Sequence, residues 1–170
     1  MSKVFSISDA KSIADFSDVA QLGKEYAAWD VQETTALGLS VDELLAFQHD
    51  YRPELLKAKF AHQENIMLLA RVGNTPAGCG GLVAMTENAA EIKTLYVSAT
   101  FRGLGIGREL LTRLISECQK RSFKELRLET VVFMHDAVHL YQSFGFKICP
   151  AYYEIPVDFL PYTIFMRREI

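Results

Sequence analysis

The sequence has no long hydrophobic run. Among its 170 residues, no stretch approaches the roughly 18 consecutive apolar residues that a membrane-spanning helix requires. The opening residues, MSKVFSISDAKS, also lack the apolar segment that is typical of a secretory signal peptide. We therefore predict a cytoplasmic protein that does not act in a membrane.

Cysteine is scarce as well. The three cysteines, Cys79, Cys118 and Cys149, are far apart and form no C-x-x-C pair. This pattern favours free thiols in a reducing compartment over a disulfide framework or a zinc site. His135 and His139 are four residues apart, a spacing that suits a metal site on a helix, but no third ligand accompanies them. We predict no bound metal.

Charge of one sign is not in excess. The chain has 18 Lys and Arg against 21 Asp and Glu, a formal net charge of −3. Such a balance offers no sequence-wide attraction for nucleic acid or for an anionic membrane. Hydrophobic residues make up 49% of the chain and charged residues 23%, which is ordinary for a globular protein. The length suggests a single domain over residues 1–170.

The most informative stretch is residues 91–107, EIKTLYVSATFRGLGIG. Its first seven residues are rich in β-branched and aromatic side chains and predict a strand. The glycine-rich part then leads into an apolar-periodic helix, whose first turn presents unpaired N–H groups and a positive dipole end to an anion. Arg102 and Arg108 can add charge-assisted hydrogen bonds. This stretch predicts a cradle for a pyrophosphate.

Two other phosphate-binding motifs do not fit the glycine-rich stretch. A Walker loop ends in Gly-Lys-Ser/Thr, whereas this chain has Gly107-Arg108-Glu109. A dinucleotide-binding fingerprint needs the spacing G-x-G-x-x-G, and the glycines here fall at 103, 105 and 107. The pattern that remains is Arg-x-x-Gly-x-Gly after a strand.

This pattern resembles the central motif of the GCN5-related N-acetyltransferase (GNAT) family, Arg/Gln-x-x-Gly-x-Gly/Ala, which binds the pyrophosphate of acetyl-CoA. Residues 137–146, AVHLYQSFGF, are similar to a second signature of the family, A-x-x-L-Y-x-x-x-G-F. The two motifs stand in the family's order, and the resemblance covers about residues 70–146 closely. It implies an acetyl-CoA-dependent N-acetyltransferase, with acetyl-CoA as the cofactor.

The resemblance also implies an α/β fold, with a mixed, mostly antiparallel sheet of about six or seven strands and helices on both faces. Alternating and β-branched runs predict strands at residues 3–7, 65–72, 77–85, 90–97, 125–131 and 164–168. Apolar periodicity and capping residues predict helices from residues 17, 40, 53, 106 and 135. The strand–helix–strand unit over residues 90–128 predicts a parallel, right-handed crossover.

The central strand has an awkward pattern of alternation. In a regular strand, Glu91 and Lys93 would share one face with Leu95 and Val97. A β-bulge close to Leu95 would resolve this conflict, and the resemblance implies such a bulge. It would leave backbone groups free for the pantetheine arm of the cofactor. We therefore assign Leu95, Tyr96 and Val97 to cofactor binding through the main chain, with one of their N–H groups as the donor to the oxyanion.

The resemblance yields a set of site residues. The predicted cofactor-binding residues are Leu95, Tyr96, Val97, Arg102, Gly103, Leu104, Gly105, Ile106, Gly107 and Arg108. An attacking amine must lose a proton, because a free alkylamine has a pKa near 10, and the leaving thiolate benefits from an acid. Glu91 is the candidate base, or else a charged residue on a strand end. Tyr141 is the candidate acid, or else a half-buried core tyrosine.

Two classes of function stay open. The first is an enzyme that acetylates a primary amine of a small molecule or peptide. The alternative is a non-catalytic acyl-CoA-binding sensor or regulatory module, which needs the glycine loop but not Tyr141 or a base. The acceptor site is expected near Tyr26, Trp29 and Phe47, with Tyr152 and Tyr153 at its edge, although the three earlier aromatics also suit a core. We allow for a homodimer and expect no nucleic-acid partner.

Overall fold

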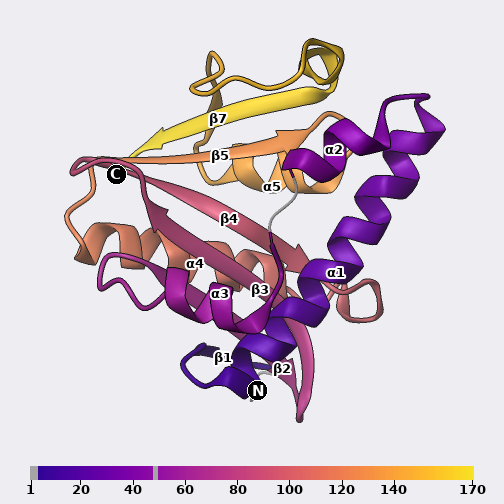
Figure 1. The fold of residues 1–170 in the computed structure, drawn as a ribbon. Helices are drawn as coiled ribbons and strands as arrows, with labels where there is room; N and C mark the ends of the chain where they lie inside the picture. The colour runs from indigo at the N-terminus through magenta and orange to yellow at the C-terminus, as the bar shows by residue number, and fades with distance from the viewer. Residues whose placement is uncertain (1–3, 48–49) are drawn as a thin grey trace.

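A computed structural model describes residues 4–47 and 50–170, except for the side chains of residues 46 and 47. Within these residues, seven strands form one sheet in the order β1-β2-β3-β4-β5-β7-β6, with helices on both faces (Figure 1). The strands are β1 Ser6–Asp9, β2 Ile66–Val72, β3 Thr75–Ala84, β4 Ala89–Val97, β5 Glu125–Val131, β6 Lys147–Ile148 and β7 Thr163–Glu169. The α-helices are α1 Ile13–Ala36, α2 Val41–Phe47, α3 Pro53–Lys59, α4 Ile106–Lys120 and α5 His135–Ser143.

The predicted α/β architecture is confirmed. Only β4 and β5 pair in parallel, through the crossover helix α4, and the other neighbouring strands in the described sheet are antiparallel. The short strand β6 was not predicted, because two residues are too few to show an alternating pattern. Lys3, where the first strand was predicted to begin, lies outside the described residues.

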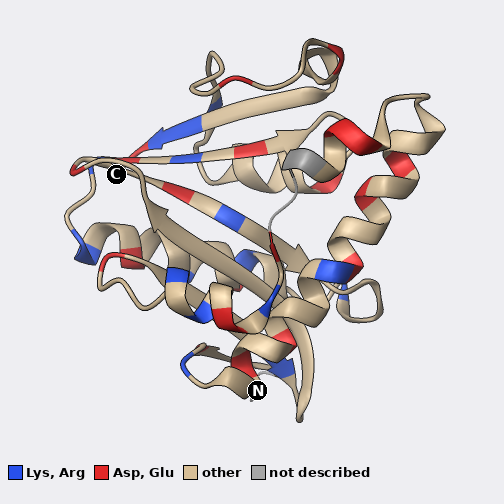
Figure 2. Cartoon of the chain, viewed as in Figure 1, with Lys and Arg blue, Asp and Glu red and all other residues tan. Residues whose placement is uncertain are grey.

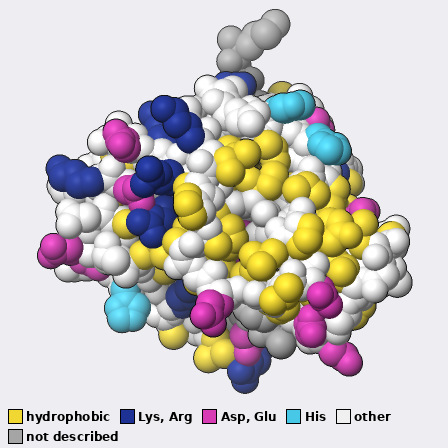
Figure 3. Space-filling view, turned by 90° about the horizontal axis from the view of Figure 1, so that it is seen from above, with side chains coloured by type: hydrophobic (Ala, Val, Ile, Leu, Met, Phe, Trp, Pro, Cys, Tyr) yellow, Lys and Arg dark blue, Asp and Glu magenta, His cyan; other side chains and the backbone are white. Residues whose placement is uncertain are grey.

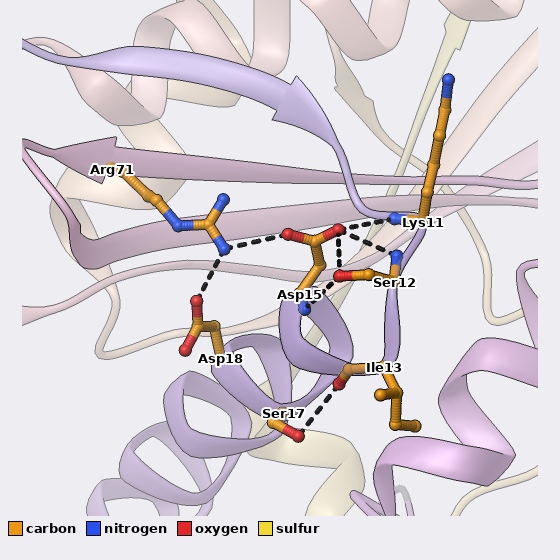
Figure 4. A network of polar contacts seen from close by, with 7 residues as sticks. All are labelled: Lys11, Ser12, Ile13, Asp15, Ser17, Asp18 and Arg71. Atoms are coloured by element: carbon orange, nitrogen blue, oxygen red, sulfur yellow. Dashed lines mark hydrogen bonds and ion pairs between the residues drawn. The ribbon is translucent and has the colours of Figure 1, made fainter.

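Helix α1 begins at a capping box (Figure 4). The hydroxyl of Ser12 accepts a hydrogen bond from the N–H of Asp15 at 3.0 Å, and the carboxylate of Asp15 accepts one from the N–H of Ser12 at 2.9 Å. Arg71 on β2 binds both Asp15, at 3.0 Å, and Asp18, at 2.6 Å. The backbone N–H groups of Lys11 and Ser12, together with Arg71, hold the pKa of Asp15 well below its usual range. These contacts tie the start of α1 to the sheet.

Each face of the sheet buries its own hydrophobic cluster. Helices α1 to α3 lie in front of the sheet in Figure 1, whereas α4 and α5 lie behind it. The apolar stripe of α4, which the sequence predicted, packs behind the sheet through Ile106, Leu110, Leu111, Leu114 and Cys118. The front cluster is formed by α1, α3 and the central strands, and includes Phe16, Val19, Leu22, Leu56, Met67, Leu69, Cys79 and Tyr96. Because both faces of the sheet are buried, the orientation of its edges relative to the helices is fixed.

Strand β4 contains the bulge that the sequence predicted. Gly81 pairs with Lys93 and Cys79 pairs with Tyr96, so β4 holds one more residue than β3 between these pairs. Thr94, inside the irregular segment, has a φ of 53°, which is unusual for a β-branched residue. Tyr96 belongs to the front cluster. Because of the extra residue, side chains do not alternate regularly between Lys93 and Tyr96.

Strands β4 and β5 separate soon after they meet. Their parallel pairing covers Ala89–Glu91 of β4 and ends where Glu91 faces Arg127. On the other side of β4, Gly80 leaves space for the bulge: a Cβ atom there would lie 2.9 Å from the side chain of Leu95. The end of β4 therefore keeps an open edge toward β5, at the carboxyl ends of both strands, where sites in such sheets form.

Charged side chains are spread over many elements. Figure 2 shows Lys and Arg on several helices and strands, with Asp and Glu interspersed.

Within residues 4–47 and 50–170, no helix combines the length and apolar character needed to cross a membrane.

Candidate active site

A cavity lies at the open end of β4. Its volume is about 630 Å³, within the range of typical small-ligand sites. The cavity is bounded by α1, the end of β4, the glycine loop and the start of α5. Its lining residues are Tyr26, Trp29, Leu95, Tyr96, Val97, Phe101, Arg102, Gly103, Gly105, Ile106, Gly107, Phe133, Met134, His135, Asp136, Ala137, Leu140 and Tyr141. We call this cavity the cofactor cleft.

The glycine loop has the backbone geometry of an anion cradle. Gly103 and Gly105 have φ values of 80° and 83°, in the left-handed region, and Gly105 caps the N-terminus of α4. A Cβ atom at either position would have no neighbour within 4 Å, so the space beside the loop is open. The first turn of α4 directs its N–H groups and positive dipole end toward this space. The residues present therefore fit a pyrophosphate.

Eight of the ten predicted cofactor-binding residues line the cleft. The two that do not are Leu104 and Arg108. The guanidinium of Arg108 lies 5.2 Å from the ring centre of Phe144. Arg102 does line the cleft, and its Nε donates a hydrogen bond to the carbonyl of Val97 at 3.3 Å. Of the two arginines, Arg102 thus has the better position for binding an anion in the loop.

Tyr141 on α5 faces the cofactor cleft. Its side chain is 5% exposed and packs edge-on against Phe146, with ring centres 5.9 Å apart. Burial raises the pKa of its hydroxyl above the ordinary value. Among the described residues the hydroxyl has no hydrogen-bond partner, so it is available to a ligand in the cleft. The structure thus places the predicted acid in the same cavity as the predicted oxyanion donors.

Glu91 occupies a different environment from Tyr141. It is only 4% exposed and lines neither the cofactor cleft nor the neighbouring pocket. One carboxylate oxygen lies 2.8 Å from Nζ of Lys93, and the other accepts a hydrogen bond from the hydroxyl of Tyr152 at 2.8 Å. Both oxygens are therefore engaged by protein groups, which leaves Glu91 poorly placed to contact an amine directly.

A second pocket adjoins the cofactor cleft. It has a volume of about 100 Å³ and shares Tyr26 and Phe133 with the cleft. The shared residues make the two cavities neighbours. The pocket is lined by Tyr26, Asp30, Thr34, Leu37, Leu39, Glu43, Leu44, Glu129, Thr130, Val131, Phe133, Ile155, Pro156, Phe159, Tyr162 and Thr163. We call it the acceptor pocket.

Two carboxylates of the acceptor pocket have unusual acidities. Burial raises the pKa of Glu129 to about 7 and the pKa of Asp30 to about 6. The negative charges of Glu91 and Asp30 add to the effect on Glu129, whereas Lys93 opposes it. The side chain of Glu129 is nevertheless exposed to solvent, as expected for a group that lines an open pocket. A group with a pKa near 7 can exchange a proton at neutral pH.

Sequence reasoning missed Asp30 and Glu129. Asp30 lies one helical turn beyond Tyr26, and Glu129 lies on the face of β5 opposite the buried residues Leu128 and Thr130. Both positions could be read from the sequence, but an acidic residue on an amphipathic element is usually solvated. Only the fold shows that α1 and β5 enclose a common pocket.

The predicted aromatic residues of the acceptor site fall in different places. Tyr26 lines both cavities, and Trp29 lines the cofactor cleft with its ring 5.7 Å from that of Phe133. Tyr152 and Tyr153 do not line the acceptor pocket but contact its surroundings, since the hydroxyl of Tyr153 donates a hydrogen bond to Glu129. The side chain of Phe47 lies outside the described residues.

His135 and His139 both belong to α5, and His135 lines the cofactor cleft. Among the residues that the structure describes, no three His, Cys, Asp or Glu side chains are grouped so that they could hold a metal ion.

Comparison with known proteins identifies the family. A model of the acetyltransferase (GNAT) family matches residues 33–146. An uncharacterised N-acetyltransferase of Schizosaccharomyces pombe is 32% identical over 167 residues, which are 97% of this chain and 94% of the relative. One from Bacillus subtilis is 33% identical over 100 residues, which span 58% of this chain and 65% of the relative. The chain belongs to the GNAT family of acetyltransferases.

Solved structures share the fold along the whole chain. A putative acyl-CoA N-acyltransferase from Klebsiella pneumoniae is 26% identical, with a TM-score of 0.71 and 99% of both chains covered. The PaiA N-acetyltransferase of Thermoplasma acidophilum, solved with coenzyme A, has a TM-score of 0.76 at 20% identity, with 100% of both chains covered. The predicted family, the enzyme class and acetyl-CoA as the cosubstrate are thus confirmed at the level of the family.

Proposed function

We propose that this acetyltransferase transfers the acetyl group of acetyl-CoA directly to a primary amine of a small molecule or peptide. The observation that carries the proposal is the junction of the two cavities at Tyr26 and Phe133. A thioester in the cofactor cleft and an amine in the acceptor pocket would meet there. Direct transfer needs only this juxtaposition, because holding two reactants in contact lowers the entropic barrier.

In this proposal, bound acetyl-CoA supplies the activated acyl group, and the chain's own residues do the rest. The glycine loop and the start of α4 hold the pyrophosphate, with Arg102 beside them. The backbone N–H groups of Leu95, Tyr96 and Val97 lie at the open end of β4, where a donor can stabilise the developing oxyanion. Tyr141 gives a proton to the departing thiolate.

Two carboxylates compete for the role of base. Glu91 was the predicted base, but it is already bound by Lys93 and Tyr152 and does not line the acceptor pocket. Glu129 lines that pocket. We therefore propose that Glu129 receives the proton of the amine and that Glu91 holds Lys93 and Tyr152 in place beside it.

The cofactor site is tested by Gly105→Glu. A carboxylate in the cradle would repel the pyrophosphate, and a side chain at a φ of 83° would strain the loop. We expect acetyl-CoA no longer to raise the melting temperature of this variant. Gly73→Glu, in the β2–β3 turn with a φ of 58°, is the matched control for backbone strain and charge. Unchanged acetyl-CoA affinity in Gly105→Glu would place the cradle elsewhere.

The chemistry is tested by release of the CoA thiol across a panel of primary amines, with the wild type and Tyr141→Phe. The variant keeps the ring and removes the hydroxyl, so its fold and acetyl-CoA binding should persist. We expect kcat to fall about 10²-fold, the low end for loss of a general acid, because a thiolate is a fairly good leaving group. A variant that binds acetyl-CoA and retains wild-type kcat, with chemistry rate-limiting, would reduce Tyr141 to a packing residue. A wild type that binds acetyl-CoA but acetylates no amine would favour a sensor.

A further inference from the structure

The acceptor pocket changes character along its length. One wall is formed by Tyr26, Asp30 and Thr34 of α1 and by Leu37, the C-cap of this helix; they recur every three or four positions and so lie on one face. At about 1.5 Å of rise per residue, Asp30 lies roughly 6 Å along the helix from Tyr26, and Leu37 lies roughly 16 Å from it. Because Tyr26 also borders the cofactor cleft, the acidic part of this wall is near the cleft and the apolar part is far from it.

The far end of the pocket continues into an exposed apolar rim. Leu37, at this end of the wall, belongs to a lining that also includes the apolar residues Leu39, Leu44, Ile155, Pro156 and Phe159. Beside them, Leu45, Val157 and Leu160 are 51%, 77% and 46% exposed. Figure 3 shows a broad group of hydrophobic side chains around a hollow on the face seen from above. Large apolar side chains left in water around a pocket indicate a surface that a ligand covers.

The charges of the pocket complement a single cation. Asp30 and Glu129 both line the pocket, close enough for the charge of Asp30 to act on Glu129, and among the described residues of its lining the pocket has no Lys, Arg or His. Glu43 is the other carboxylate of the lining, and it lies on α2. An ammonium group is favoured beside Asp30 and Glu129. Glu43 is exposed, so its charge is already hydrated, whereas a hydroxyl or ammonium group set against Leu37 and Phe159 would lose its hydration to apolar side chains.

The volume of the pocket limits the size of the acceptor. About 100 Å³ is well below the roughly 300–1,000 Å³ of sites for drug-sized ligands. The pocket therefore suits a substituent of about the size of one ring, with further apolar area available at the rim.

We propose that the acceptor is an apolar monoamine: a primary amine whose nitrogen meets Glu129 and Asp30 and whose ring-sized hydrocarbon part lies against Leu37 and Phe159. This inference rests on the proposed function, of which it names the substrate class. It disfavours diamines and hydroxylated amines as acceptors. The discrimination follows from the burial of apolar area, which contributes roughly 1.5–3 kcal/mol for a large side chain, or about tenfold or more in affinity.

The test is calorimetric binding of three amines to the full chain in the presence of CoA. The probes are 2-phenylethylamine, ethanolamine and 1,4-diaminobutane, which share a primary amine and differ in the group attached. We expect 2-phenylethylamine to bind at least about tenfold more tightly than either of the others. Leu37→Ser should reduce its affinity several-fold and leave that of ethanolamine unchanged. Leu55→Ser on α3 is the matched control, because Leu55 is 43% exposed, against 40% for Leu37, and lines neither cavity.

Equal affinity of the three amines, tighter binding of 1,4-diaminobutane, or no binding of any amine would overturn the inference. So would an unchanged affinity for 2-phenylethylamine in Leu37→Ser. The proposed function fails separately: selective binding of 2-phenylethylamine without release of CoA thiol from acetyl-CoA would contradict acetyl transfer and leave the pocket's selectivity established.

Discussion

At the N-terminal end of α1, Asp15 and Asp18 share the guanidinium of Arg71, and Asp15 also accepts backbone hydrogen bonds. Toward the C-terminal end of the same helix, Asp30 lines, together with Glu129, a pocket whose described lining contains no cation. The pKa of Asp15 is lowered and that of Asp30 is raised to about 6. One helix thus holds carboxylates in two opposite environments.

The difference separates stability from function. A lowered folded-state pKa means that the carboxylate stabilises the fold above the pKa of the unfolded state, and that this contribution is lost as the pH falls through the folded value. A raised pKa has the opposite sign: the protonated form is preferred in the fold, so stability falls as the pH rises toward the raised value. Asp15 therefore supports the fold at neutral pH, whereas Asp30 and Glu129 cost stability there, as residues of functional sites often do.

The largest effect should come from the pocket end, in Glu129→Gln. If Glu129 takes the proton of the amine, kcat/KM should fall by about 10²–10⁴-fold. Wild-type activity should rise as the pH increases through about 7, and the variant should lose this dependence. The measurement is a pH–rate profile between pH 5.5 and 9 for the best acceptor.

Glu91→Gln is the companion to this variant. It removes the partner of Lys93 and Tyr152 but leaves the lining of the acceptor pocket unchanged, so the pH dependence should persist with a smaller loss of activity. If Glu91→Gln abolishes the pH dependence and Glu129→Gln does not, the base is Glu91, as the sequence alone suggested.

An intermediate effect is expected at the other end of the helix, in Asp15→Ala. The substitution removes half of the capping box and one partner of Arg71, which together should cost about 1–2 kcal/mol of unfolding free energy at pH 7. The loss should shrink as the pH falls below about 4, because Asp15 of the unfolded wild-type chain then begins to protonate while the folded chain keeps it ionised to a lower pH. Urea unfolding at several pH values measures it. Ser17→Ala, which removes a hydroxyl bonded only within the same helix, is the control and should be nearly neutral.

The smallest effect, and one of opposite sign, is expected for Asp30→Asn. Because the wild-type carboxyl resists ionisation in the pocket, the amide should raise the melting temperature at pH 7.5 and have less effect at pH 5. The gain should be a fraction of a kcal/mol, since the group keeps some contact with water. A lower melting temperature at pH 7.5 would show that Asp30 supports the fold, and the contrast between the two ends of α1 would collapse.

Much of the cofactor side was predictable from the sequence. The glycine loop has a local signature, and the bulge in β4 followed from the alternation, in which Glu91 and Lys93 would share a face with Leu95 and Val97. These features depend on residues that are neighbours in the chain, so their geometry follows from local rules. The strands and helices of this half were also predicted to within a few residues.

The acceptor side was not predictable in the same way. Asp30 and Glu129 come from elements far apart in the sequence, and neither position departs from ordinary amphipathic patterning. Burial raises the pKa of both groups, and the nearby charges of Glu91 and Asp30 add to the effect on Glu129; both causes are properties of the tertiary fold. The surroundings of Glu91 were not predictable for the same reason, since Tyr152, its hydrogen-bond partner, comes from the segment after β6.

The early separation of β4 from β5 has a consequence for the lifetime of the protein. Beyond Glu91, the edge of β4 that faces β5 has no neighbouring strand in the described part of the chain, and such an edge is a template for pairing with other chains. A cofactor that occupies the adjoining cleft shields this edge and stabilises the folded state by RT ln(1 + [L]/Kd). Resistance to proteolysis should then rise, and aggregation should fall, as the supply of acetyl-CoA increases. The abundance of the enzyme thereby becomes sensitive to the metabolite that it consumes.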